Sequence, residues 1–407
     1  MRKNAKSLFV TIIILVLLSV DPLYSQNITN TITNTMEGNS VKERFGLPTY
    51  SSEIINEYSA EDKIVLPFVY NGFIYTFSLN RKRPLWRFFI GGDLENPFVL
   101  NGKRLFFFDI YNRLYSVNLA DGKLMWIRDV NDEIIGQPFI VKNKIVIATQ
   151  KGNILAFSEA DGKLIMQYDT EREIAGGINF YNNLMIIAFK EGLIEAYNIY
   201  TGKKVWQFAN TGFISVKPVV NKGKLFFGTW DNNFYSLDVK EGKLVWVNYV
   251  GSEVSRDFLV FKNSIVLFLS GGEILSLNKQ NGVIEWVKYF KGIDFDYNYF
   301  GGIDKFYVFI PELIAYDPNN GSMVFAYRER TYKLYEDMLF DMMVEGKHFI
   351  DEKEREKLLR DKYFVVNNYP ILPPVKSDDL AYYVGDDSNL YVYDIKKDFF
   401  ILKYKLE

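Results

Sequence analysis

Residues 224–249 read KLFFGTWDNNFYSLDVKEGKLVWVNY and contain three short strands separated by two turns. A polar turn separates Lys224–Thr229 from Phe234–Val239, and both segments alternate apolar and polar residues. Gly242 then turns the chain into Lys243–Tyr249. Short alternating strands joined by Asn, Asp and Gly turns are typical of antiparallel hairpins. With another strand predicted at 216–220, the segment forms a four-stranded unit.

The last turn and strand of this unit recur along the chain. Six glycines each precede, by four residues, an aromatic residue or its substitute. The glycines are Gly122, Gly162, Gly202, Gly242, Gly282 and Gly321, at steps of 40, 40, 40, 40 and 39 residues. The closing residues are Trp86, Trp126, Met166, Trp206, Trp246, Trp286 and Phe325. This register predicts a repeat protein with a unit of about forty residues.

Two further units follow when the register is extended to both ends. The first uses Asn80–Arg83 in place of the glycine turn, and Glu53–Tyr58 is predicted as its first strand. The last covers residues 374–404 and has Leu402 at the position of the closing aromatic residue. The sequence therefore predicts eight units, with seven as the alternative if the last one is misassigned.

A four-stranded sheet with two apolar faces cannot bury both faces alone. Stacking such sheets side by side in a closed ring buries both faces of each one. We therefore expect an all-β fold over residues 50–407, an eight-bladed β-propeller of four-stranded antiparallel blades that closes between its first and last blades.

The N-terminus has the pattern of an export signal. Residues 1–6 are basic, residues 7–20 are apolar, and cleavage is expected after Ser25. The alternative is an uncleaved membrane anchor, which would be the protein's only membrane contact. Residues 26–49 are rich in Asn and Thr and are expected to form a flexible leader. The body is therefore expected outside the cytoplasm, in the periplasm or cell envelope.

Composition excludes several classes of function. The chain has no cysteine and one histidine, His348, so thiolate metal sites, disulfides and paired imidazoles are excluded. Its net charge of −2 does not favour a nucleic acid partner. No phosphate-binding, zinc-protease or serine-hydrolase motif is present. We therefore predict a non-enzymatic protein with no catalytic, cofactor-binding or metal-binding residues.

Polar residues gather in the predicted turns. The acid pairs Asp378-Asp379 and Asp386-Asp387 are expected as solvated turns, with calcium binding as the alternative. Asp109, Glu191 and Asp231 lie near loops between second and third strands, where a polar binding surface is possible.

One segment, 331–366, interrupts the repeats between the seventh and eighth units, and we expect a small helical insertion there. Four of its residues lie on one helical face and are candidates for partner binding: Tyr335, Met338, Leu339 and Met342. The alternative is that this face packs against the propeller itself. His348 is expected in the loop between the two helices.

The segments 196–206 (AYNIYTGKKVW) and 236–246 (SLDVKEGKLVW) resemble the PQQ-like repeat of quinoprotein-type β-propellers. The resemblance implies eight blades, with the closing tryptophans docked between adjacent blades: Trp86, Trp126, Trp206, Trp246 and Trp286. Within the family, the size and the export signal are most similar to the BamB-type outer-membrane assembly factors, which are periplasmic scaffolds. Those are normally lipoproteins, whereas this sequence has no cysteine to carry the lipid.

Two hypotheses of function follow from this resemblance. The first is a non-enzymatic exported scaffold that binds envelope proteins, including components of the barrel-assembly machinery. The second is a quinone-dependent dehydrogenase or a propeller that binds a small ligand or carbohydrate. Missing cysteines and short loops between strands argue against the dehydrogenase.

Overall fold

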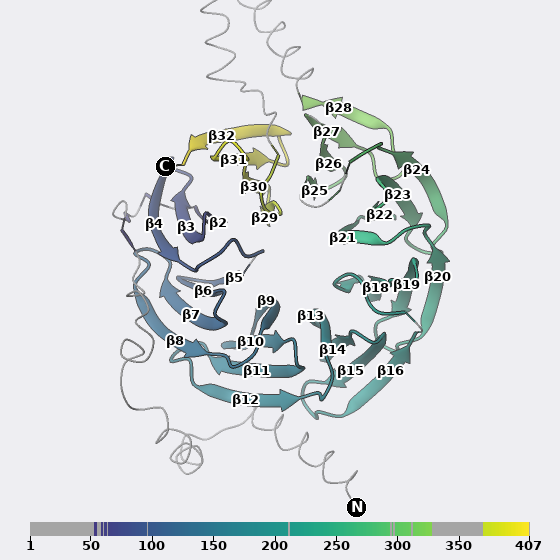
Figure 1. Ribbon diagram of the computed structural model, residues 1–407, viewed down its shortest axis with the longest axis horizontal. Coiled ribbons are helices and arrows are strands. Elements are labelled where there is room, and N and C mark those ends of the chain that lie inside the picture. The colour runs from purple at the N-terminus through teal and green to yellow at the C-terminus, as the bar shows by residue number, and fades with distance from the viewer. Residues whose placement is uncertain are drawn as a thin grey trace, which may run out of the picture. The chain divides into compact units, whose positions relative to one another are not determined.

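The computed structural model describes residues 53–327 and 369–406, apart from 55–57, 60, 63, 96, 211, 294, 296, 297 and 311. Within these residues the elements are 32 strands, arranged in eight antiparallel four-stranded sheets (Figure 1). The predicted all-β, eight-bladed propeller is confirmed. The predicted signal, leader and helical insertion lie outside the described residues, and with them His348, Tyr335, Met338, Leu339 and Met342.

Each sheet is built from strands that are close together in the sequence. The first four sheets comprise β1 (Glu53–Ile54), β2 (Val65–Tyr70), β3 (Phe73–Ser78) and β4 (Arg83–Phe89); β5 (Phe98–Asn101), β6 (Arg104–Phe108), β7 (Arg113–Asn118) and β8 (Leu124–Asp129); β9 (Ile134–Val141), β10 (Lys144–Thr149), β11 (Asn153–Ser158) and β12 (Leu164–Asp169); β13 (Ile174–Tyr181), β14 (Leu184–Phe189), β15 (Leu193–Asn198) and β16 (Lys204–Ala209).

The last four sheets continue the same pattern. They comprise β17 (Val219–Asn221), β18 (Lys224–Gly228), β19 (Asn233–Asp238) and β20 (Leu244–Tyr249); β21 (Val254–Val260), β22 (Ser264–Leu269), β23 (Glu273–Asn278) and β24 (Ile284–Tyr289); β25 (Tyr299–Gly301), β26 (Phe306–Phe309), β27 (Leu313–Tyr316) and β28 (Met323–Ala326); β29 (Val375–Ser377), β30 (Leu380–Val384), β31 (Asn389–Asp394) and β32 (Phe399–Lys405).

The chain divides into two compact units, one dominated by Asn71–Phe226 and the other by Val245–Glu407. In the first unit, successive side chains of β10 enter different cores. Ile145 and Ile147 pack with Phe106 of the preceding sheet, whereas Val146 packs with Ile187 of the following sheet. Because neighbouring side chains of a strand point to opposite faces, a central strand here is apolar on both faces.

The second unit repeats this arrangement with larger side chains. On β26, Phe306 and Val308 join a core with Phe268, and Tyr307 and Phe309 join the next core. The rings meet mostly edge to face or offset, as aromatic pairs prefer. The high aromatic content of the sequence therefore fills the spaces between blades.

The closing tryptophans connect consecutive blades. Each indole Nε1–H donates to a backbone carbonyl in the following blade, at 2.8–3.2 Å. The pairs are Trp86 to Leu119, Trp126 to Glu159, Trp206 to Val239, Trp246 to Lys279 and Trp286 to Pro318. Each indole is thus fixed in position by a hydrogen bond as well as by packing.

The glycine of the next blade lies against the indole. A Cβ on Gly282 would lie 2.5 Å from Cε3 of Trp246, and a Cβ on Gly242 would lie 2.4 Å from Cε3 of Trp206. The turn itself needs a left-handed residue, with φ of 73° at Gly282. Two independent constraints therefore select glycine at this position.

The same left-handed turn occurs in the two end blades, where glycine is absent. Lys82 and Asp398 precede Trp86 and Leu402 by four residues, and their φ angles are 52° and 56°. The seventh blade closes with Phe325 instead of Trp, and the Asp398 carboxylate accepts hydrogen bonds from Tyr307 and Lys305 of that blade. In this turn the contacts of Asp398 with Lys305 and Tyr307 take the place of the contact between glycine and tryptophan.

The first strand of the first blade was predicted wrongly. Residues Glu53–Ile54 form β1, but β1 pairs with the outer side of β4, at Glu53↔Arg87 and Ile54↔Trp86. Ser59, just after this segment, receives a 2.9 Å hydrogen bond from Arg81 in the β3–β4 turn. Because Ser59 is held beside that turn, Glu53 and Ile54 reach β4 and not β2.

We predict that Gly282→Ala destabilises the protein more than Gly292→Ala. Both glycines have φ of 73°, but a Cβ at Gly292 meets nothing within 4 Å. Gly292→Ala should lower the free energy of unfolding by about 1 kcal/mol for its backbone alone. Gly282→Ala should lose a further ~1–3 kcal/mol from the contact with Trp246. Urea unfolding of both variants measures the difference, and equal losses would contradict the packing role of this glycine.

We also predict a contribution of Tyr383 to stability in alkali. Its hydroxyl is buried without a hydrogen-bond partner among the described residues, and burial raises its pKa well above the usual value. The unfolded chain ionises this group above about pH 10, whereas the folded chain keeps it protonated, so stability falls as pH rises. Tyr383→Phe should reduce this fall by up to about 1.4 kcal/mol per pH unit. Urea unfolding at pH 9.5 to ~11.5 tests this, and an unchanged pH dependence would contradict it.

Candidate functional site

Asp109, predicted near a polar loop surface, lies instead inside its own hairpin. Its side chain is fully buried and accepts hydrogen bonds from Arg113 Nε at 2.7 Å and Tyr115 Oη at 2.8 Å. The backbone N–H groups of Tyr111 and Arg113 donate to its other oxygen. Asp109 therefore holds the β6–β7 turn together.

The acid pairs at the end of the chain lie next to lysines. Burial tends to raise the pKa of Asp387, but hydrogen bonds from Tyr391 and Asn389 outweigh this and lower it. Lys403 lies 3.5 Å from Asp387, and Lys396 lies 2.6 Å from Asp379. In the described part of the chain, no group of three or more His, Cys, Asp or Glu side chains is placed to hold a metal ion.

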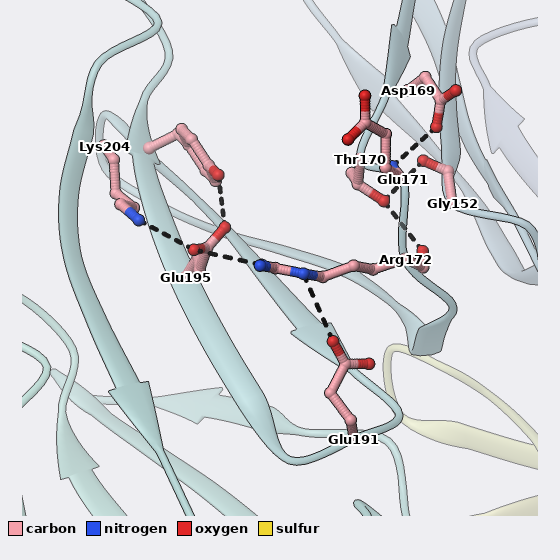
Figure 2. Close-up of polar contacts among 9 residues, drawn as sticks. Gly152, Asp169, Thr170, Glu171, Arg172, Glu191, Glu195 and Lys204 are labelled. Atoms are coloured by element: carbon pink, nitrogen blue, oxygen red, sulfur yellow. Dashed lines mark hydrogen bonds and ion pairs between the residues drawn. The ribbon is translucent and has the colours of Figure 1, made fainter. Parts of the chain in front are cut away.

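Glu191 belongs to a polar cluster on the fourth blade, which Figure 2 shows in close-up. The centre of this cluster is Glu195 on β15, whose side chain is only 6% exposed. Its carboxylate receives hydrogen bonds from Tyr197 Oη at 2.5 Å and Lys204 Nζ at 3.0 Å. Burial and the hydrogen bond to Glu195 raise the pKa of Tyr197, so its hydroxyl remains a proton donor. We call the set of Arg172, Glu191, Glu195, Tyr197 and Lys204 the Glu195 cluster.

Arg172 connects the buried carboxylate to the surface. One of its nitrogens lies 3.6 Å from Glu195 and another lies 3.5 Å from Glu191 (Figure 2). Its guanidinium also lies 5.5 Å from the centre of the Phe189 ring, within cation–π distance. The side chain is nevertheless 44% exposed. These contacts hold a planar cation in a defined orientation with one side open to solvent.

The loop that carries Arg172 is tightly held. Thr170 Oγ1 lies 2.9 Å from the carbonyl oxygens of both Gly152 and Arg172, and the Glu171 N–H donates to Asp169 at 2.8 Å (Figure 2). A Cβ on Gly152 would lie 2.2 Å from the Arg172 carbonyl oxygen. The β10–β11 turn and this loop are therefore in direct backbone contact, and only glycine fits at position 152.

Glu171 is strained within this loop. Its φ is 58°, in the left-handed region that disfavours residues with a Cβ. Counted from the closing residue of each blade, the equivalent positions include Gly91 and Gly251, with φ of 89° and 94°. The fourth blade therefore begins with an exposed carboxylate at a backbone position that two other blades fill with glycine. Strained surface residues of this kind are concentrated at functional sites.

Sequence reasoning found Glu191 but missed Glu195, Arg172 and Lys204. A signal was present at Glu195, because the equivalent third-strand positions hold Tyr115, Leu155, Tyr235 and Leu275. A carboxylate in a row of Tyr and Leu breaks the apolar pattern of the strand. Asp231, the third predicted loop residue, accepts a hydrogen bond from Thr229 and does not belong to the Glu195 cluster.

We predict that Glu171→Gly stabilises the protein by about 0.5–1 kcal/mol, because glycine removes the left-handed strain but adds entropy to the unfolded chain. The matched control is Glu173→Gly, at an exposed position of the same loop whose φ is not left-handed, and this variant should lose stability. Urea unfolding measures both changes. A loss of stability in Glu171→Gly would show that the strain is compensated by contacts of the side chain.

Comparison with known proteins gives both the fold and the family. The model of the PQQ-like repeat family described as "Outer membrane protein assembly factor BamB" matches residues 71–179 and 150–290. No curated protein sequence matches the chain. Among the described residues, no helix is both long and apolar enough to span a membrane.

Several solved structures are similar at low identity. BamB from Moraxella catarrhalis has a TM-score of 0.57 at 12% identity, covering 85% of this chain and 99% of its own. The computationally designed Ika8 protein has a TM-score of 0.55 at 11% identity, covering 76% and 86%. A europium-containing methanol dehydrogenase has a TM-score of 0.50 at 13% identity, covering 77% and 78%. An assembly factor, a designed protein and an enzyme share this fold, so fold alone does not decide function.

The family follows from the sequence match. The two matched segments together span residues 71–290, which is more than half of the 407 residues. They include all five closing tryptophans and five of the six turn glycines on which the resemblance was based. The chain therefore belongs to the BamB-like family of PQQ-repeat β-propellers.

Proposed function

We propose that this protein is a non-enzymatic exported scaffold that binds an envelope protein through the loops of its fourth blade, in the assembly of outer-membrane proteins. The family description supports the biological role. The strained, exposed Glu171 beside a fixed and half-exposed Arg172 carries the assignment of the binding surface. The export pattern at residues 1–25 supports a location in the periplasm or cell envelope.

The chemistry of this surface suits recognition of a polar protein segment. Arg172 presents guanidinium N–H groups to solvent and is already oriented by Glu191 and Glu195. Binding a carboxylate or carbonyl of a partner therefore requires little additional ordering of this side chain. Glu171 places a negative charge next to this cation. A partner segment with an acidic and a basic side chain close together matches both charges.

Site-specific photo-crosslinking in intact cells of the source organism tests this function. A photoreactive amino acid at Glu171 should form a crosslink to a component of the outer-membrane barrel-assembly machinery. The control position is Thr201, which is exposed in the β15–β16 turn at the other end of the same blade. Crosslinking from Thr201 should be absent or much weaker.

The contribution of Arg172 to the affinity for the partner is tested with the purified partner protein. Arg172→Ala should weaken binding by about 10-fold or more, as expected when an oriented charged contact is lost from an interface. Lys203→Ala, an exposed cation in the β15–β16 turn, should leave the affinity unchanged. Equal crosslinking at both positions, or a purified protein that binds quinone and reduces a dye with calcium present, would overturn the proposal.

A further inference from the structure

The turns at one end of the first compact unit are basic. In an antiparallel sheet, the turn between the first and second strands lies at the same end as the turn between the third and fourth. The turns of the first kind in blades two to five cover residues 101–104, 141–144, 181–184 and 221–224. They contain no Asp or Glu and six cations: Lys103, Arg104, Lys142, Lys144, Lys222 and Lys224. We call these six residues the basic patch.

The opposite end of the same sheets is acidic. The loops that connect β4 to β5, β8 to β9, β12 to β13 and β16 to β17 contain six carboxylates and two cations. The carboxylates are Asp93, Glu95, Asp132, Glu133, Glu171 and Glu173, and the cations are Arg172 and Lys217. The net charge of −2 for the whole chain therefore does not reveal that the two ends of these blades carry opposite charges.

Contacts between neighbouring blades join the basic turns into one surface. Each contact connects two turns at this end of the unit. They are the hydrogen bond from Asn101 Nδ2 to Glu159 at 2.9 Å, the position of Lys142 Nζ at 5.1 Å from the centre of the Tyr200 ring, and the position of Tyr181 Oη at 3.5 Å from a Cβ on Gly223. Because the turns are packed against one another, their cations form a patch that extends over several blades.

The turns between third and fourth strands do not cancel this charge. Their carboxylates lie beside lysines of the same turn, since Lys163 lies 3.5 Å from Asp161 and Lys243 lies 2.7 Å from Glu241. On the fourth blade, the turn at 199–203 contains a lysine and no carboxylate. The basic end therefore keeps an excess of positive charge.

Two cations of the basic patch occupy unfavourable backbone positions. Lys142 and Lys222 have φ of 47° and 46°, whereas the equivalent turn positions hold Gly102 and Asn182, which adopt this conformation more easily. Burial and then the nearby charge of Lys142 lower the pKa of Lys144. An anion beside these lysines would offset their repulsion. Strained residues of this kind are concentrated at functional sites.

Apolar side chains are exposed next to the basic turns. They lie at the start of each outer strand, directly after the turn between third and fourth strands, and are 37% to 50% exposed. These side chains are Leu124, Met125, Leu164, Val205 and Leu244. Toward the acidic end the same strands expose Asp129, Gln167, Asp169 and Gln207 instead. Cations and exposed apolar groups are therefore gathered at one end of the unit.

We propose that the basic end of the first unit binds the surface of an anionic lipid bilayer. The basic patch contacts headgroup phosphates, and the neighbouring apolar side chains contact the boundary below the headgroups. Lysines spread over several blades match a flat array of phosphates, whereas recognition of one anion needs donors that converge. The exposed ring of Tyr200 beside Lys142 fits the same interface, where tyrosine is enriched.

This binding goes beyond the proposed function and does not depend on it. The acidic loops lie at the other end of the same sheets, so bilayer contact at the basic end leaves Glu171 and Arg172 facing away from the lipid. A partner bound to those loops is then held at a fixed distance from the membrane surface.

Flotation of the full chain with lipid vesicles tests the proposal. Phosphatidylcholine vesicles with about 30% phosphatidylglycerol should bind the chain about tenfold or more strongly than pure phosphatidylcholine, and ~0.5 M NaCl should release it. Lys142→Asn combined with Lys222→Asn should weaken binding by about tenfold or more. Because Asn182 occupies the same turn position, these substitutions suit the backbone. Thermal unfolding verifies that the double variant is folded.

The matched control removes the same charge from the acidic end. Lys151→Asn combined with Lys190→Asn replaces two exposed lysines in the turns between second and third strands, and this variant should bind like the unmodified chain. Equal weakening by both double variants would show that only the overall charge matters, which would overturn the assignment of the basic patch.

An environment-sensitive dye reports which end contacts the lipid. The chain has no cysteine, so Thr201→Cys and Gln150→Cys each create a single labelling site, in exposed turns at the basic and the acidic end. On anionic vesicles the emission of the dye at position 201 should shift to the blue, and that of the dye at position 150 should not change. The reverse result would contradict the proposed orientation.

Two other results would also overturn the proposal. Equal binding to neutral and anionic vesicles would assign the membrane contact to the apolar residues 7–20. Binding of polyglutamate without binding of vesicles would identify an acidic protein as the occupant instead. Failure of the Glu171 crosslink would refute the proposed function but leave the vesicle results unaffected.

Discussion

The contact between a closing indole and the left-handed glycine of the next blade is the interaction on which the rest of the structure depends. It combines a hydrogen bond, a buried aromatic surface and a backbone conformation that glycine tolerates best. Each of these contributes modestly to stability alone, but all three meet at one point between successive blades. Because the contact repeats at a fixed spacing, the blades that close with Trp126, Trp206, Trp246 and Trp286 meet the turn of the next blade in the same way.

This contact lies at one end of each sheet, in the turn between the third and fourth strands. The loops at the other end carry no such requirement, so they tolerate residues that differ from blade to blade. The fourth blade uses this freedom for Glu171 and Arg172, whereas the sixth and seventh blades have Gly251 and Gly292 in the corresponding loops. A rigid repeat thus supports a local polar site, which is the usual relation between scaffold and function.

Two surfaces of different chemistry follow from this organisation. The Glu195 cluster is polar and internally balanced in charge, and its contacts join Arg172 of the β12–β13 loop to side chains of the fourth blade. Val247 and Tyr249 on β20, and Val287 and Tyr289 on β24, are apolar side chains exposed on the last strands of their sheets.

The sequence by itself determined the repeat, the number of blades and the family, because strand period and turn chemistry are local properties that recur every forty residues. It also identified Trp246 and Gly282 as structural, since their spacing is regular. Only the tertiary structure decided that Asp109 is buried, that Glu195 meets Arg172 from another loop, and that β1 pairs with β4. The contacts of Glu195 and of β1 join segments distant in sequence. Asp109 contacts residues of its own hairpin, but a turn residue's type does not reveal whether its side chain faces solvent or a partner. Strain at Glu171 likewise became visible only through its backbone angle, which no local pattern encodes.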